Sequence, residues 1–510
     1  MKTLKISGFN CNRGEDQLII YNNGGHTTGT NVYGCEAVVG PDGIVISVGG
    51  NDKMIPVGGF VVSAHGVMAG EIKKELVPGT WVNASMEFMH IEYNLDEAAT
   101  EKIFIQKLEN VKSRLDAIID ELTEAQIANV KNLMLEATEQ AKEGDYEKAS
   151  DTLDMAYCYT AASTEGEIRA VWHRPREHSD AEVDAYVKRF ADAGFNLMLI
   201  ETNYEGYCNA IKCRYDFLPI RKGYESFDVI QSYIDAGERH GVKIHAWVEN
   251  FFFGVQGAGC PMAEMHPERM ARDRKGGMLL DGYDTFYFLN PALPENRQLL
   301  LDMYRDILQN YDFDGIQLDY IRYPVIKDID HTAGFEPQTI EMFKEATGID
   351  LREIESISDP RWEKFCYWCA DIITGYVGEV RKMVDEFNKG GRSIELSTAI
   401  FGERHKAIMF KCQDWCTWAD RDWLDFVSPM AYFADPEDIR KEVQHMVENY
   451  GKAPNVAGIS PMYNRMPIIE TTRQVEACRE AGAKGVAFFE ATACTDKQIE
   501  VLTNGAFRKK

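Results

Sequence analysis

Acidic side chains follow several apolar runs of this sequence at the points where those runs end. Glu201, Glu249, Asp319 and Glu490 each close such a run, and aromatic residues stand near each of them. Two carboxyl groups at one site can cleave a glycosidic bond, because one protonates the leaving oxygen while the other stabilises or attacks the anomeric centre. Burial and crowding raise the pKa of one carboxyl group and leave the other ionised, which supplies both forms near neutrality. Aromatic rings beside such groups suit sugars, whose C–H faces stack on them.

One of these acids lies in the stretch 313–324, which reads Phe-Asp-Gly-Ile-Gln-Leu-Asp-Tyr-Ile-Arg-Tyr-Pro. By the two-residue period of a strand, Ile316 and Leu318 share one face. Gln317 and Asp319 share the other face, and Asp319 then stands at the carboxyl end of the strand, where barrel enzymes keep their chemistry. Alternatively, Asp319 only caps the next turn or pairs with Arg322, since structural ion pairs are common.

A second polar face is predicted in the stretch 242–250, where apolar residues occupy every second position. This alternation directs His245, Trp247 and Glu249 to the side away from the helices. Glu249 and Glu490 are both candidates for the general acid, and Glu249 is favoured because its strand neighbours that of Asp319.

Strands and helices alternate from residue 168 onward, which predicts parallel strands joined by helices. The expected strands are 168–173, 196–201, 242–249, 314–319, 394–400, 424–432, 455–460 and 485–490. Eight such units indicate an α/β fold, the (β/α)8 or TIM barrel. The competing fold is a doubly wound open sheet, which usually carries a Gly-rich turn after its first strand. Here that turn reads Trp-His-Arg-Pro-Arg, which favours the barrel.

Two shorter segments precede the barrel, which we expect over residues 166–510. Residues 1–94 hold short alternating runs divided by Asn-Asn-Gly-Gly and Pro-Asp-Gly turn signals, so we expect a β-rich domain. Residues 95–165 hold apolar positions at three- and four-residue steps, interrupted at Glu-Gly-Asp 143–145, which predicts a helical hairpin or small bundle.

The composition and net charge of the chain limit the classes of partner that it can bind. The chain has 510 residues and a formal net charge of −26, which opposes binding to nucleic acid or to an anionic membrane surface. The N-terminus lacks the apolar core of a signal peptide, and no run of about 18 apolar residues occurs. We therefore expect a cytoplasmic protein whose cysteines are free buried thiols.

Metal sites are the main chemical alternative. His173, His245 and Glu249 could ligate one ion together, and the acids at several strand ends could hold magnesium or calcium. Two cysteine pairs, Cys366 with Cys369 and Cys412 with Cys416, have spacings that suit a zinc site poorly. We expect no metal and no cofactor.

The residues also resemble a known family. The string 314–324, Asp-Gly-Ile-Gln-Leu-Asp-Tyr-Ile-Arg-Tyr-Pro, is similar to the strand-4 motif of the family 10 glycosyl-hydrolase-like proteins, which reads D-G-I-x-L-D-Y-I-R-Y-P. Supporting matches are Arg-Ala-Val-Trp 169–172, Ala-Gly-Phe-Asn 193–196, Glu201 and Ser-Pro-Met-Ala-Tyr 428–432. The resemblance covers nearly the whole chain and implies a (β/α)8 glycosidase with a β-rich N-terminal domain.

The strand-4 motif is also similar to that of family 18 chitinases, D-G-x-D-x-D-x-E. In this chain Gln317 replaces the first acid of the D-x-D-x-E part, and Ile321 stands at the catalytic glutamate position. This departure argues against the substrate-assisted mechanism of those chitinases.

We therefore expect a glycoside hydrolase in which Asp319 acts at the anomeric centre as nucleophile or electrostatic stabiliser. Its expected substrate is an oligo- or polysaccharide. The rival hypotheses are a barrel that binds glycan without cleaving it, and a metal-dependent carbohydrate hydrolase or deacetylase. The residues expected to bind substrate are Glu201, Tyr204, His173, Trp247, Asn250, Arg322, Tyr323, Tyr432 and Tyr463, with Arg322 also holding Asp319 ionised.

Overall fold

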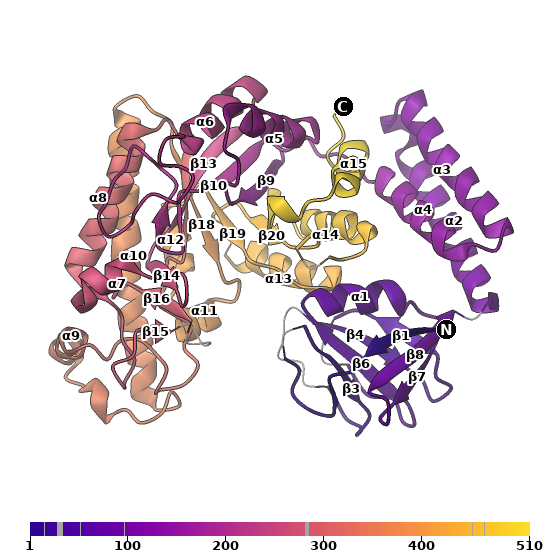
Figure 1. Ribbon diagram of the computed structural model, residues 1–510, viewed down its shortest axis with the longest axis horizontal. Helices are drawn as coiled ribbons and strands as arrows, with labels where there is room; N and C mark the ends of the chain where they lie inside the picture. The colour runs from indigo at the N-terminus through magenta and orange to yellow at the C-terminus, as the bar shows by residue number, and fades with distance from the viewer. Residues whose placement is uncertain are drawn as a thin grey trace.

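The computed structural model describes residues 1–14, 16–27, 34–50, 53–95, 97–280, 285–450, 452–463 and 465–509. Figure 1 shows a barrel, a β-rich domain at the N-terminus and a group of long helices that joins the two in sequence.

The barrel is one sheet of parallel strands. They are β9 (Ile168–His173), β10 (Leu197–Glu201), β13 (Lys243–Glu249), β17 (Gly315–Asp319), β18 (Glu395–Ile400), β19 (Phe426–Pro429), β20 (Val456–Ile459) and β21 (Gly485–Phe488). Their order is β19-β18-β17-β13-β10-β9-β21-β20. Parallel bridges from Val427 to Asn455 and from Met430 to Gly458 bring β19 beside β20, so the sheet is nearly closed. The predicted (β/α)8 architecture is confirmed.

Each barrel strand sends alternate side chains inward and outward, as its pleat requires. Ala170, Trp172, Leu199 and Trp247 form an apolar cluster with one another inside the barrel. The residues between them pack in the much larger core between the strands and the surrounding helices. The chief covering helices are α5 (Asp180–Asp192), α6 (Val229–His240), α8 (Pro294–Asn310), α10 (Pro360–Lys389), α13 (Pro436–Asn449), α14 (Ile468–Glu480) and α15 (Asp496–Asn504).

Shorter elements extend the barrel at the carboxyl ends of its strands. The small sheet β14 (Phe252–Val255), β15 (Leu279–Leu280) and β16 (Phe286–Phe288) follows β13, together with α7 (Pro261–Met265). The helix α9 (Pro337–Thr347) follows β17, and α11 (Arg404–Lys411) and α12 (Trp415–Asp420) follow β18.

The N-terminal domain contains two sheets. One has the order β2-β3-β6-β4-β5, with β2 (Gly8–Phe9), β3 (Leu18–Tyr21), β4 (Gly34–Val39), β5 (Val45–Val48) and β6 (Phe60–His65). The other has the order β1-β8-β7, with β1 (Lys2–Lys5), β7 (Thr80–Ser85) and β8 (His90–Leu95). This β-rich domain also holds a helix, α1 (Val67–Glu75), which follows β6. Its buried face is formed by Ala69 and Ile72, which stand one helical turn apart.

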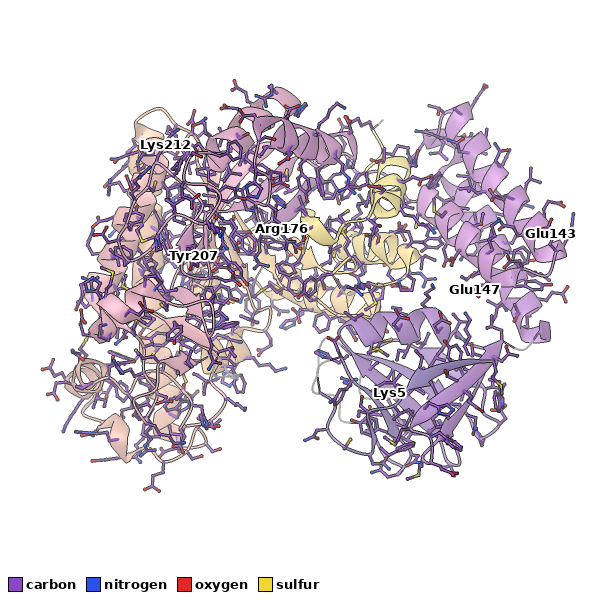
Figure 2. The ribbon with its side chains drawn as sticks, in the orientation of Figure 1. Lys5, Glu143, Glu147, Arg176, Tyr207 and Lys212 are labelled. Atoms are coloured by element: carbon purple, nitrogen blue, oxygen red, sulfur yellow. The ribbon has the colours of Figure 1, made fainter. Side chains whose placement is uncertain are left out.

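The helical segment consists of α2 (Glu97–Ile118), α3 (Glu124–Lys142) and α4 (Tyr146–Tyr159). Thr123 begins α3 with a capping box, in which its hydroxyl accepts from the backbone of Gln126. The segment lies against α14 and α15, and the Tyr159 hydroxyl donates to Glu500 at 2.7 Å. Glu147 lies at the end of α4 that is nearer the N-terminal domain (Figure 2), where Lys2 donates to it at 3.1 Å.

No helix of the described residues is long and apolar enough to cross a membrane. All cysteines are unpaired thiols, and all except Cys11 are buried, as predicted.

Candidate active site

Three carboxyl groups converge at the carboxyl ends of three neighbouring strands. Glu201 ends β10, Glu249 ends β13 and Asp319 ends β17. Glu249 and Asp319 are partners in the parallel register of β13 and β17, so their side chains leave the sheet on the same side. Trp247, which lies inside the barrel, is the partner of Glu201. We call Glu201, Glu249 and Asp319 the acid cluster.

Asp319 is the partly exposed member of the acid cluster, and donors hold both of its oxygens. The indole Nε1 of Trp247 donates to Oδ2 at 3.1 Å, and the backbone N–H of Tyr320 donates to Oδ1 at 2.7 Å. Burial raises the pKa of Asp319, while these two donors and the charges of Arg322 and Arg174 act against that rise. Each of the two carboxyl oxygens accepts a hydrogen bond, which favours the ionised form.

Glu249 has the opposite surroundings. Its side chain is buried, with the residue 1% exposed, and neither carboxyl oxygen accepts a hydrogen bond from the nitrogen and oxygen donors of the described residues. Burial raises its pKa well above the ordinary value, and the negative charges of Glu201 and Asp319 raise it further. Glu249 is therefore the carboxyl group of the cluster that favours its protonated form.

Glu201 is within hydrogen-bonding reach of Glu249, so the two can share a proton. Burial raises the pKa of Glu201 to about 7, and the rise is limited by the charge and hydrogen bond of Arg174. Two adjacent carboxyl groups with one cation beside them hold a proton near neutral pH.

Arg174 is a site residue that the sequence analysis missed. Its Nε donates to Glu201 Oε1 at 3.0 Å. Its guanidinium carbon lies 4.3 Å from the ring centroid of Tyr204, 4.9 Å from that of Trp247 and 5.6 Å from that of Phe489. A signal for it was available, because Arg174 stands two residues after the inward-facing Trp172 and shares its side of the chain.

Aromatic side chains surround the acid cluster at the barrel mouth. Phe489 is central, with ring centroids 5.4 Å from Tyr432, 5.3 Å from Tyr463 and 6.2 Å from Trp172. Tyr463 is 55% exposed and is open to solvent. We call Tyr204, Tyr432, Tyr463 and Phe489 the aromatic rim; it contains three of the tyrosines expected to bind substrate.

Below the acid cluster, polar side chains bond to one another across the barrel. Trp172 Nε1 donates to Gln317 Oε1 at 2.6 Å, and Gln317 Nε2 donates to Ser428 at 3.2 Å. Gln317 therefore has partners on two other strands and forms a rigid floor beneath Asp319.

Asn250 was expected to orient substrate, but it lies on the helix side of the sheet. Its side-chain amide donates to the backbone carbonyl of Asp319 at 2.6 Å, and its own Oδ1 accepts from Tyr304 of α8 at 2.6 Å. Asn250 therefore holds the carboxyl end of β17 from the helix side of the sheet, and its side chain does not face the acid cluster.

His173 and Glu490 are also separated from the cluster. The Tyr233 hydroxyl lies 2.7 Å from His173 Nε2, and the His173 ring lies 4.5 Å from that of Tyr186, so His173 packs between α5 and α6. Glu490 accepts from the hydroxyl of Thr492, and its charge acts on the partly buried Tyr186 of α5. Of the two candidates for the general acid, Glu249 lies in the cluster and Glu490 faces α5.

Tyr323 was expected at the substrate site but is buried, with its hydroxyl near the thiol of Cys369 on α10. Arg322 is buried as well, and its Nη1 donates to the Tyr323 carbonyl at 2.9 Å. Its guanidinium lies 4.8 Å from the Tyr320 ring centroid, close enough for its charge to act on Asp319. Arg322 thus acts on the carboxylate, while Tyr323 packs in the helix layer.

The histidine–glutamate metal hypothesis does not match this geometry. His173 lies on the helix side, and His245 lies at the opposite end of the barrel, where its Nε2 is 3.3 Å from Glu395. His245 and Glu249 are four strand residues apart, roughly 13 Å along the chain. Over the described ranges, no group of three or more His, Cys, Asp or Glu side chains is arranged to hold a metal ion.

Comparison with known proteins gives a family and a fold. Residues 167–456, more than half of the chain, match the sequence model of a family described as glycosyl hydrolase-like 10. No curated protein sequence matches the chain. The glycoside hydrolase domain of PgaB (BpsB) from Bordetella bronchiseptica is similar in structure, with a TM-score of 0.51 and 17% identity over 67% of this chain and 100% of that one. This likeness concerns the fold.

Two further solved structures are more distant. The catalytic domain of β-amylase from Paenibacillus polymyxa gives a TM-score of 0.48 and 11% identity, covering 66% of this chain and 95% of that one. The α-galactosidase from Lactobacillus brevis gives 0.40 and 13%, covering 70% of this chain and 42% of that one.

Proposed function

The chain belongs to the glycosyl hydrolase-like 10 family, and from the acid cluster we propose that it is a glycoside hydrolase acting on an oligo- or polysaccharide. The observation that carries the proposal is the contrast between two neighbouring carboxyl groups. Asp319 accepts two hydrogen bonds, whereas Glu249 is buried without a nitrogen or oxygen donor among the described residues. One is held as a base and the other as an acid, which are the two forms that glycosidic cleavage needs.

In the proposed mechanism Glu249 protonates the leaving oxygen of the scissile bond. Glu201 takes part as the partner that shares the proton of Glu249, and its pKa of about 7 lets the pair exchange that proton near neutral pH. The Arg174 guanidinium is positively charged and its Nε donates to Glu201. It therefore offsets part of the negative charge of the Glu201–Glu249 pair. Asp319 acts at the anomeric carbon, with Trp247 holding the carboxylate oriented.

The strand register supports one of the two stereochemical outcomes. Glu249 and Asp319 are register partners on adjacent parallel strands, whose backbones lie about 4.8 Å apart. Carboxyl groups on such positions are closer to the separation of about 5 Å typical of retaining enzymes than to the ~6.5–9.5 Å of inverting ones. We assign Asp319 as a nucleophile and expect retention of anomeric configuration, which proton NMR of the first product would detect.

The aromatic rim provides stacking surfaces for sugar rings. Tyr432, Tyr463 and Phe489 come from three different strand ends, and both tyrosine rings pack on Phe489. Arg174 lies against Tyr204 and Phe489, so the rim and the acid cluster form one surface. We propose that successive sugar units stack here while one glycosidic bond lies over Asp319.

The test is digestion of a panel of glycans with detection of new reducing ends, with and without a chelator. Release of sugar that the chelator leaves unchanged is the expected result. Saturable glycan binding with no released product would instead identify a barrel that binds without cleaving. Activity that a chelator abolishes would indicate a metal-dependent hydrolase, and either outcome overturns the proposal.

A further inference from the structure

The N-terminal domain meets the barrel at two of its carboxyl-end loops. These are residues 430–435, between β19 and α13, and the described residues of the segment 461–467 (461–463 and 465–467), between β20 and α14. Ala434 and Met466, one from each loop, are buried within the apolar core of the N-terminal domain, together with Ile72 of α1. Figure 1 shows α1 lying directly against the α13 and α14 side of the barrel. Each loop therefore contributes one side chain to the core of the N-terminal domain.

One lysine of α1 joins the first of these loops to helix α14, which follows the second loop. Lys73 Nζ donates to the backbone carbonyl of Ala434 at 2.7 Å, and it lies 3.2 Å from Glu470 in the first turn of α14. The Lys73 side chain is 9% exposed and that of Glu470 is 1% exposed, so the pair is shielded from solvent. Arg473 lies 3.1 Å from Glu470 on the other side. Shielded charge pairs are screened little by salt and hold their partners in a fixed geometry.

The same two loops carry half of the aromatic rim. Tyr432 stands two residues before Ala434, and Tyr463 stands three residues before Met466. Both tyrosine rings pack on Phe489, which in turn contacts Arg174. A shift of either loop would therefore move a ring of the proposed sugar-stacking surface.

The backbone of the N-terminal domain also approaches the first loop closely. A Cβ atom built on Gly49 would lie 2.9 Å from Asp435 Oδ2, closer than side-chain atoms normally come. This approach comes from Gly49, directly after β5, so two different segments of the N-terminal domain, α1 and the end of β5, contact the loop 430–435.

From these contacts we propose that the N-terminal domain completes the substrate site by holding Tyr432 and Tyr463, and that Lys73 is the positioning residue through which it does so. The inference rests on the proposed function for its substrate class. The contact between the domain and the loops does not depend on it. Lys73 touches no reacting group, so it acts on how substrate binds.

The test compares Lys73→Met with Lys74→Met, its exposed neighbour on the same helix. Hydrogen exchange by mass spectrometry should show faster exchange in residues 430–435 and 461–467 for Lys73→Met and no change for Lys74→Met. On a long glycan substrate, KM should rise by about tenfold, the effect of one charge-assisted hydrogen bond, while kcat stays within about twofold. Lys73→Arg should restore both measurements.

A second variant protects the test against misfolding. If Lys73→Met does not fold, Glu470→Gln removes the ion pair while leaving the Ala434 bond, and it should give the same faster exchange. Combining Lys73→Met with Tyr463→Ala should raise KM by less than the product of the single effects, because both act on one ring. Unchanged exchange in the two loops overturns the inference whatever the substrate. Faster exchange with no glycan cleaved or bound would leave the contact standing and refute the proposed function.

Discussion

Replacing Trp247 by Phe removes the indole donor to Asp319 and keeps an aromatic ring beside Arg174. The lost hydrogen bond, 3.1 Å long, is made to a carboxylate. Such bonds contribute about 1.5–3 kcal/mol. Since one pKa unit corresponds to about 1.36 kcal/mol, the pKa of Asp319 should rise by about 1–2 units.

The direction of the effect on activity follows from the role of Asp319. The donor stabilises the charged form, so its loss raises the pKa, and the protonated fraction at any acidic pH increases. The acid limb of the pH profile of kcat/KM should therefore move by about 1–2 units toward higher pH. The assay is initial-rate hydrolysis from acidic to alkaline pH at substrate concentrations below KM.

Trp172→Phe is the matched control, because its indole donates to the neutral Gln317 amide at 2.6 Å inside the same barrel. Both substitutions lose the same atoms from the barrel interior, so both should cost similar stability. Only Trp247→Phe should move the acid limb. If the acid limb of kcat/KM lies at the same pH for both variants and the parent, the roles given to the Trp247 indole and to Asp319 are refuted.

Three further outcomes are expected. Glu249→Gln should lower kcat by about 10²–10⁴ on natural glycans and much less on dinitrophenyl glycosides, whose leaving group needs no proton; equal losses on both would contradict its role as general acid. Gly315→Ala should destabilise the fold by about 1–3 kcal/mol in urea unfolding, because its Cβ would lie 2.5 Å from the ring of His245. Gly375→Ala, with open space around it, is the control and should not destabilise. The contact of His245, whose Nε2 lies 3.3 Å from the carboxylate, is the chief reason why the pKa of Glu395 is lowered, to about 2. Its stabilising effect should be complete above pH 4.5 and lost as pH falls toward 2, and Glu395→Gln should remove that part of the acid transition.

The barrel and most of its interior were predictable from the two-residue period of a strand. The alternation assigned Trp247 and Glu249 to the inner face of β13, and it assigned Gln317 and Asp319 to the inner face of β17. Because these two strands are neighbours in the barrel, Glu249 and Asp319 were expected to lie close together. The period was informative because each strand is buried on both sides and must sort its side chains between two different environments.

Extending the two-residue alternation one or two residues past each strand end would have corrected the predictions for His173 and Glu490, and it would have identified Arg174. Trp172 faces inward, so Arg174 does too, and His173 faces the helices. Phe489 takes the inward position after β21, which turns Glu490 toward α5. Site residues at the strand ends were predicted by chemical type, whereas the side chains after β9 and β21 continue to alternate between the barrel interior and the helix layer.

Contacts between distant loops lay beyond sequence reasoning. Nothing in the sequence near Lys73 indicates that its ammonium group reaches Ala434 and Glu470, more than 300 positions away. Such contacts depend on how two domains pack, and the packing is set by many small apolar contacts with no local signature.

The central claim is that the acid cluster is the catalytic site, and the rate of hydrolysis by Asp319→Asn tests it most directly. The substitution keeps the size of the side chain and removes its charge, and Asp314→Asn, at the other end of β17, is the matched control. Turnover of a glycan that the parent cleaves should fall by more than about 10²-fold in Asp319→Asn, with binding and folding retained, and should stay near normal in Asp314→Asn. Near-normal hydrolysis by Asp319→Asn would contradict the assignment of the acid cluster as the catalytic site.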